Sequence, residues 1–204
     1  SMLFKKFLLI AVLFFGVAPF AGQSQAPRKG DTTISWKEGY LDLHHINTGR
    51  GDAAYYVFPD GTTLLFDAGE QDPTDKRTHS ARNSAIRPND SKRPYEWIAH
   101  YIKQVAPANR KPVINYAILS HFHDDHMGAY YETAPRSAKG DYVLTGITGI
   151  AELIPVDVLL DRGYPSYNIP YNMKSKEFEE SLKNNPSSYG YWKTMNNYFS
   201  FIMR

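Results

Sequence analysis

The sequence predicts an α/β fold, and three observations carry that prediction. Strand-like runs follow one another between residues 40 and 66, and a Pro-Asp-Gly turn at 59–61 separates two of them. Apolar residues then recur at helical spacing from Pro94 to Val105. A further apolar strand, Val113 to Leu119, comes soon after this helix. This succession of strands, helix and strand suits the first half of an αββα sandwich.

Each element has its own local signal. Proline presets the backbone of a turn residue and glycine accepts positive φ, so the 59–61 turn predicts a hairpin between Ala53–Phe58 and Thr62–Phe66. Pro94 opens the predicted helix, and Ala106-Pro107 ends it. The remaining expected elements are a strand over 40–46, a helix over 124–131, a short segment over 149–154, a strand over 156–160, and helical pieces near 174–183 and 191–202.

Length and composition fit one globular domain over residues 31–204, without an internal repeat in the sequence. The formal net charge is +2 and the basic residues are scattered, which gives no argument for nucleic acid or an anionic membrane as a partner. The chain contains no cysteine, so disulfides and a lipid anchor on an N-terminal cysteine are excluded. Function must therefore be sought in local motifs.

The first 26 residues have the order of a secretory signal peptide. Lys5-Lys6 precede the apolar stretch Phe7 to Val17, and small or polar residues follow it. The apolar stretch is short for a transmembrane helix, which needs about 20 residues. We expect an exported protein, periplasmic or extracellular. An uncleaved N-terminal membrane anchor is the alternative, because Pro19 and Pro27 disturb the cleavage region.

Three of the seven histidines lie in one loop, Ser120 to Gly128, directly after a predicted strand. His121 and His123 are two apart, so in extended backbone both side chains project the same way and can bind one ion together. Asp125 and His126 follow near the expected start of a helix. Imidazole and carboxylate are zinc ligands. The sequence therefore predicts a metal site, against the alternative of a polar turn with ordinary surface hydrogen bonds.

The pattern H-x-H-x-D-H over residues 121–126 resembles the metal-binding motif of the metallo-β-lactamase-fold hydrolases. The resemblance implies a first ion on His121 and His123, a second ion on Asp125 and His126, and an attacking hydroxide between or beside them. Asp125 is then the expected catalytic residue, since it holds the second ion and orients the hydroxide. One or two zinc ions are expected, with manganese or iron as alternatives.

A second resemblance joins the loop Gly49–Asp52 to the strand end Phe66–Gly69. Together with the hairpin they resemble the branch of the fold that includes the hydrolase domain of the DNA-uptake channel ComEC. That likeness implies that Asp67 orients a ligand histidine from below. The alternatives are that Asp67 caps a turn and that Asp52 bonds its own loop. Arg50 departs from the branch's usual glutamine, so the substrate does not carry over.

The second half of the sequence departs from the family. No histidine follows His126, so the first ion would lack its third protein ligand. Asp161 is the downstream candidate for a bridging carboxylate. The apolar cluster formed by Tyr198, Phe199, Phe201 and Ile202 is expected to lack a cover. We expect an N-terminal part of a longer protein; a shortened metal-poor relative and a homodimer that completes the site are the alternatives.

The expected function is that of an exported metal-dependent hydrolase that cleaves an ester-type bond in a small molecule, with phosphodiesters favoured. The segment Glu70 to Arg93 is either a substrate loop or a surface excursion, and its His79 and Arg82 are candidates for anion contact. The competing expectation is a catalytically inactive half-fold that serves as an exported binding protein, with a tyrosine-rich C-terminal part as its contact surface.

Overall fold

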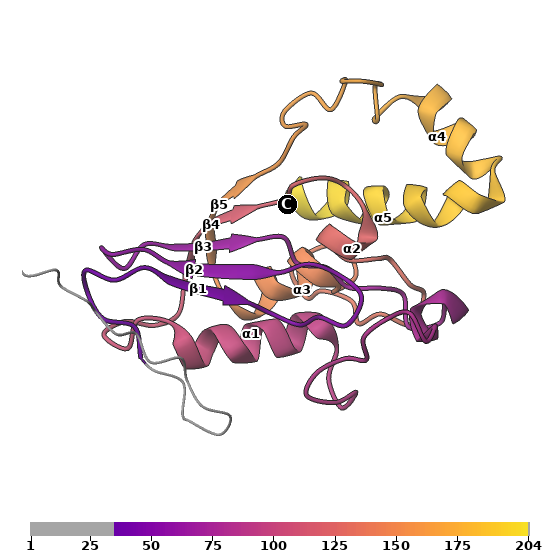
Figure 1. Cartoon of the computed structure of the whole chain (residues 1–204). Helices are drawn as coiled ribbons and strands as arrows, with labels where there is room; N and C mark the ends of the chain where they lie inside the picture. Colours follow the sequence, from indigo (N-terminus) through magenta and orange to yellow (C-terminus); the bar gives the residue numbers. More distant parts are fainter. Residues whose placement is uncertain (1–34, 204) are drawn as a thin grey trace, which may run out of the picture. The chain divides into compact units, whose positions relative to one another are not determined.

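The computed structural model describes residues 35–203, so the expected signal segment over 1–26 lies outside the described residues. The described part is α/β, as predicted, and contains a five-stranded mixed sheet in the order β1-β2-β3-β4-β5 (Figure 1). β1 to β3 are antiparallel, and β3 to β5 are parallel. Within this part no helix is long and apolar enough to cross a membrane. The strands are β1 Asp42–His45, β2 Ala54–Val57, β3 Thr63–Phe66, β4 Ile114–Ile118 and β5 Val156–Leu160.

The predicted hairpin between β2 and β3 is confirmed. The Phe58 N–H donates to the Thr62 carbonyl at 2.8 Å, and the Gly61 N–H donates back to the Phe58 carbonyl at 2.8 Å. Gly61 has a φ of 83°, which glycine adopts without strain. The Asp60 carboxylate accepts the Thr62 N–H at 2.9 Å and closes the turn. The turn residues therefore set the register of the two strands.

Two helices cover one face of the sheet (Figure 1). α1 spans Pro94–Val105 with the predicted bounds, and α3 spans Gly146–Leu153. Proline at the first position and Glu96, whose carboxylate accepts the Arg93 N–H at 2.7 Å, explain where α1 begins. The core between the helices and the sheet is formed by fully buried side chains, among them Tyr55, Leu65, Ile98, Ile102, Ile114, Ile147 and Ile150.

The opposite face of the sheet exposes apolar side chains. Strand register places one row of them across all five strands, and a second row across three. Several are large and well exposed, such as Leu43 at 51% and Leu160 at 47%. Residues 35–203 form only one sheet, so the second sheet of an αββα sandwich is not among them. The rows, called here the apolar sheet face, are Leu43, Tyr56, Leu64, Tyr116 and Val158, and Phe66, Ile118 and Leu160.

The C-terminal part corrects one prediction. α4 spans Lys176–Lys183, and α5 spans Pro186–Ile202, five residues longer at its start than predicted. Tyr198 and Phe201 were expected to lack a cover, but they are 1% and 5% exposed. The expectation was wrong because α5 packs on the rest of the unit: the Tyr198 ring lies 5.8 Å from the Phe122 ring.

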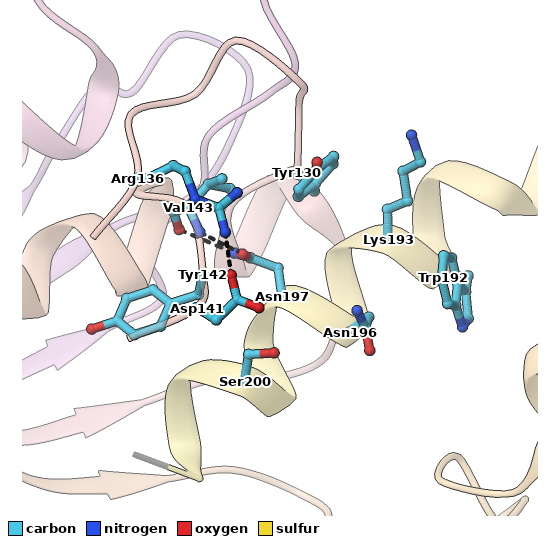
Figure 2. Close-up of a pocket in the computed structure, with 10 residues that line it drawn as sticks. All are labelled: Tyr130, Arg136, Asp141, Tyr142, Val143, Trp192, Lys193, Asn196, Asn197 and Ser200. Atoms are coloured by element: carbon cyan, nitrogen blue, oxygen red, sulfur yellow. Dashed lines mark hydrogen bonds and ion pairs between the residues drawn. The ribbon is translucent and has the colours of Figure 1, made fainter. Parts of the chain in front are cut away.

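α5 is also fixed by polar contacts. The side-chain amide of Asn197 accepts the Val143 N–H at 2.7 Å and donates to the Val143 carbonyl at 3.1 Å. This pair of bonds borders a pocket of about 280 Å³ between α5 and the loop before α3, where Arg136 pairs with Asp141 (Figure 2). The buried amide thus replaces a strand partner for the backbone at residue 143.

Candidate metal centre

The loop from Ser120 to Gly128 follows β4 and is fixed by backbone hydrogen bonds to the end of β3. The Ala68 N–H donates to the His126 carbonyl at 2.7 Å, and the Ala129 N–H donates to the Glu70 carbonyl at 2.7 Å. These bonds join two segments far apart in the sequence. The predicted helix over 124–131 is shorter than expected: α2 spans only Asp124–Met127, since Gly128 at φ 103° ends it.

Gly69 permits the close approach of these segments. A Cβ built on Gly69 would lie 2.0 Å from the Asp125 carbonyl oxygen, far inside van der Waals contact. The same oxygen accepts the Asp52 N–H at 2.9 Å. The loop before β2, the end of β3 and α2 therefore meet at the Asp125 carbonyl, and only glycine fits at position 69.

His121 and His123 lie side by side at the start of the loop. His121 Nε2 is 3.1 Å from His123 Nδ1. Two nitrogens that ligate one zinc ion at about 2.0–2.1 Å stand about 3.3 Å apart in a tetrahedral shell. His121 is partly buried and His123 is exposed. Burial lowers the pKa of His121, and the nearby His126 and His123 lower it further. The neutral imidazole that metal binding requires is thereby favoured.

Asp67 sets the protonation of two of these rings. It is 2% exposed, and its carboxylate receives His126 Nδ1 at 2.8 Å and the Ser120 hydroxyl at 2.7 Å. An ionised carboxylate can only accept hydrogen bonds. His126 therefore donates its Nδ1–H to Asp67, and the Ser120 hydroxyl donates its single proton to the same carboxylate. The Ser120 oxygen then accepts the proton on His121 Nδ1, 3.0 Å away. In its neutral form each ring therefore carries its proton on Nδ1 and leaves Nε2 bare.

Carboxylates face the bare Nε2 of His126. Asp52 lies 3.6 Å from this nitrogen, and Asp125 lies 3.9 Å from it. For Asp52 the sequence suggested only a bond within its own loop, and it did not predict that this carboxylate lies next to His126. With a neutral His126 ring, this nitrogen and the two carboxylates are all acceptors, an arrangement that a cation would satisfy.

Three of the four predicted ligands form one group. The ligand atoms of His121, Asp125 and His126 all lie within 4.8 Å of one another. His123 stands outside this group but contacts His121, as described above. The donor set of imidazole nitrogens and carboxylate oxygens fits a divalent ion.

The downstream candidate Asp161 is used differently. Its carboxylate accepts the hydroxyls of Tyr167 at 2.5 Å and Tyr198 at 2.6 Å, together with two backbone N–H groups after β5. It is not in the group of candidate ligands. Of the candidates for anion contact, His79 bonds the Pro73 carbonyl at 2.8 Å, and Arg82 is exposed.

Glu70 was not predicted as a site residue from the sequence, yet it connects α1, α3 and the metal loop. Its carboxylate is fully buried and pairs with Arg93 at 2.9 Å. It also accepts the N–H groups of Tyr95 at 3.2 Å and Gly146 at 3.1 Å, which lie at the starts of α1 and α3. Burial raises the pKa of Glu70, and the Arg93 guanidinium opposes that rise. The only sequence signal was a carboxylate directly after Asp67-Ala-Gly, which does not reveal its partners.

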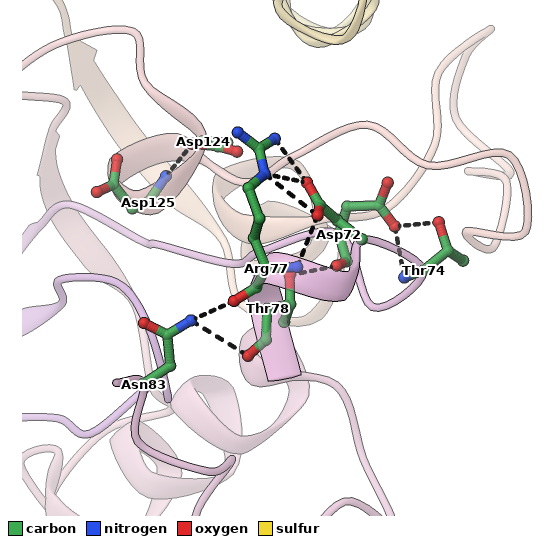
Figure 3. A network of polar contacts seen from close by, with 8 residues as sticks. Asp72, Thr74, Arg77, Thr78, Asn83, Asp124 and Asp125 are labelled. Atoms are coloured by element: carbon green, nitrogen blue, oxygen red, sulfur yellow. Dashed lines mark hydrogen bonds and ion pairs between the residues drawn. The ribbon is translucent and has the colours of Figure 1, made fainter. Parts of the chain in front are cut away.

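One basic segment borders the loop. η1, a 3₁₀ turn over Lys76–His79, directs Arg77 toward Asp124 at the start of α2 (Figure 3). Arg77 is bound to the Asp75 carboxylate at 2.6 Å. The excursion between β3 and α1 therefore reaches the metal loop instead of projecting away from it.

No protein-family model, curated protein or solved structure matches the chain.

Proposed function

We propose that this chain is a metal-dependent hydrolase with the metallo-β-lactamase arrangement of strands and ligands, and that it cleaves ester-type bonds, with phosphodiesters favoured. The observation that carries the proposal is the group of His121, Asp125 and His126, with His123 in contact with it. The N-terminal signal pattern supports an exported enzyme.

The residues that would hold the ions divide into two sets. His121 and His123 offer two imidazoles, which suit zinc. Asp125 and His126 form the second set, and Asp52 adds a carboxylate to it. Bound zinc would lower the pKa of water from about 16 to about 7, which supplies hydroxide at neutral pH, and would polarise the bond to be cleaved.

The chain's own residues prepare this chemistry. Asp67 keeps the Nδ1 proton on His126 and, through Ser120, on His121, so that both Nε2 atoms remain free to ligate. The Asp125 carboxylate accepts a hydrogen bond from the attacking water and orients it. The backbone of Glu70 bonds Asp124 and Ala129 and so holds the loop in place, while its buried carboxylate fixes the starts of α1 and α3.

The proposal is tested by metal content. We expect one or two zinc ions per purified wild-type chain by elemental analysis. His121→Ala and His123→Ala should each lose the ion, with a small change in melting temperature because neither side chain is fully buried. His100→Ala, an exposed histidine on α1, is the matched control and should keep the metal.

Activity gives the second readout. Wild-type protein loaded with zinc should hydrolyse bis-p-nitrophenyl phosphate, and the two loop variants should not. Wild-type metal content in both loop variants would refute the assignment of the site.

A binding protein is the second candidate, and one observation favours it. The linker between β5 and α4 exposes large side chains, with Tyr164 at 74%, Ile169 at 77% and Tyr171 at 67%. Exposed tyrosines of this kind provide contact area at low entropic cost. A folded chain that neither retains zinc nor hydrolyses the phosphodiester would support this function in place of the enzyme.

A further inference from the structure

A pocket lined by arginines lies beside the candidate metal centre. It has a volume of about 380 Å³ and is formed by the loop at 48–50 and the excursion over 71–94. Arg50, Arg87 and Arg93 line it, and Asp90 is its single lining carboxylate. Volumes from about 300 Å³ upward are typical of small-molecule sites. The name arginine pocket is used for this space below.

The arginines of the pocket differ in how they are paired. Arg93 is committed to Glu70 at 2.9 Å and to the Gln71 carbonyl at 3.1 Å. Arg50 acts electrostatically on Asp75, which is already bound by Arg77. Within residues 35–203, the Arg87 side chain forms neither an ion pair nor a hydrogen bond. The pocket therefore holds positive charge that the protein itself does not neutralise.

The wall of the pocket contains two buried side chains with unused polar atoms. Thr48 is 4% exposed and Gln71 is 7% exposed. In the described part of the chain, Thr48 Oγ1 and Gln71 Nε2 have no hydrogen-bond partner. Both atoms are closed to solvent, so the charged groups that meet a ligand in the pocket are the arginines. A ligand that suits guanidinium groups must supply acceptors and negative charge, which describes an oxyanion.

The pocket is joined to the metal loop through two glycines. A Cβ on Gly49 would stand 3.4 Å from the Ser84 carbonyl, in the excursion that forms the pocket. A Cβ on Gly51 would stand 3.0 Å from the Asp125 carbonyl, in the metal loop. Arg50 lies between these two contact points in the chain. A substrate bound at the metal loop therefore has a basic pocket next to it.

We propose that the arginine pocket binds an anionic group of the substrate, a phosphate or a carboxylate, that is separate from the bond being cleaved. This inference rests on the proposed function. The substrate is then an ester that carries a second negative charge, and Arg50 and Arg87 select for it. Arg93 contributes to the pocket while it holds Glu70.

The test uses the full chain after its metal has been removed with a chelator, so that the metal centre cannot bind the probe. Inorganic phosphate and malonate are titrated separately by calorimetry. We expect saturable binding to wild type, weakened at least about fivefold in Arg50→Gln and in Arg87→Gln. Arg82→Gln, an exposed arginine of the same excursion outside the pocket, should bind like wild type.

The probes distinguish the two sources of charge. Tighter binding of phosphate identifies a phosphate-bearing substrate, and tighter binding of malonate identifies a carboxylate-bearing one. Either result supports the pocket.

Three results would overturn the inference: no saturable binding to the metal-free wild type, equal binding in the two pocket variants and wild type, or equal weakening in Arg82→Gln. None of them depends on metal content, so failure of the pocket is separable from failure of the metal assignment.

Discussion

At the scale of single residues, the two nitrogens of His126 have different surroundings, and this difference suits the proposed role of the ring as a metal ligand. Nδ1 faces the buried carboxylate of Asp67, whereas Nε2 faces Asp52 and Asp125. A carboxylate behind a ligand histidine fixes its tautomer and raises its basicity. The same carboxylate reaches His121 through Ser120. One buried residue thus orients both rings.

Asp67→Asn tests this role. Asparagine tolerates the φ of 59° found at position 67, so the backbone should be retained. Its amide can donate to His126 and no longer demands the Nδ1 proton. We expect zinc affinity to fall about 10- to 100-fold, measured by competition with a chromogenic chelator. Asp141→Asn, at a 91% exposed carboxylate, is the control. Unchanged affinity in Asp67→Asn would remove Asp67 from the centre.

The residues of the centre were predictable to the extent that they are neighbours in sequence. His121, His123, Asp125 and His126 lie within six residues, and local spacing was enough to group them. Glu70 was not predictable, because its partners lie 23 and 76 residues away and only the fold brings them together. Asp52 was missed for the same reason, since its carboxylate meets His126 across the sheet end.

At the scale of elements, the short helix α2 depends on close backbone contact. Gly69→Ala would push the Asp125 carbonyl away, because the new Cβ would need the space that this oxygen occupies. We expect a loss of about 1–3 kcal/mol in the free energy of unfolding, together with weaker zinc binding. Urea denaturation and the chelator assay measure the two effects.

Gly190→Ala is the matched control for that change. Gly190 lies within α5, and a Cβ there would meet nothing within 4 Å. Alanine in a helix interior should stabilise the protein by about 0.5–1 kcal/mol. Equal effects of the two substitutions would show that the close approach at Gly69 is unimportant.

The contact between β5 and α5 should depend on pH. Burial raises the pKa of Asp161, but the hydrogen bonds from Tyr167, Tyr198 and two backbone N–H groups outweigh it and hold the pKa below its usual value. A carboxyl with a lowered folded-state pKa stabilises the protein above its unfolded pKa of about 3.9, and this contribution is lost as the pH falls.

Asp161→Asn should therefore be less stable than wild type at pH 7, and the gap should narrow below about pH 4. Denaturation curves across that range measure the gap, with Asp141→Asn as the exposed control. A gap that stays constant down to acidic pH would contradict the role given to the ionised carboxylate.

Element boundaries were predicted best where a residue forces them. β5 and α1 have the predicted bounds, since Pro94 and Pro107 delimit the helix. α2 ends early because Gly128 adopts a positive φ beside the backbone of Gly146. α5 begins early at Pro186, a residue compatible with the first helical turn. The end of α2 and the start of α5 depend on packing between distant segments, which local sequence patterns do not reveal.

At the scale of the whole molecule, the apolar sheet face is the main unpaired surface of the described unit. Exposed apolar rows of this size promote association. We expect concentration-dependent self-association in sedimentation velocity. Val158→Lys, at the centre of the edge strand β5 and on the apolar sheet face, should reduce it, while Ser166→Lys adds the same charge off the sheet and should not. A wild type that stays monomeric at all concentrations would contradict this prediction.

The α/β class followed from the order of strand and helix signals, but the bare face and the position of α5 did not. The alternation of side chains along each strand predicts that the sheet has two different faces. It does not predict which elements cover each face. Tyr198 and Phe201 illustrate the difference, because their burial depends on Phe122 and Tyr142, which are distant in sequence.

Glu70 gives the fold a particular evolutionary constraint. Its carboxylate binds Arg93 and the starts of α1 and α3, and its backbone bonds Asp124 and Ala129 in and beside the metal loop. Substitutions on the loop surface can accumulate one at a time and be tried for new substrates. A change at Glu70 takes the carboxylate from Arg93, from the start of α1 and from the start of α3 in a single step, so it should be tolerated less readily than a change on the loop surface. The chemistry of this loop is free to diversify only while that single buried acid is inherited unchanged.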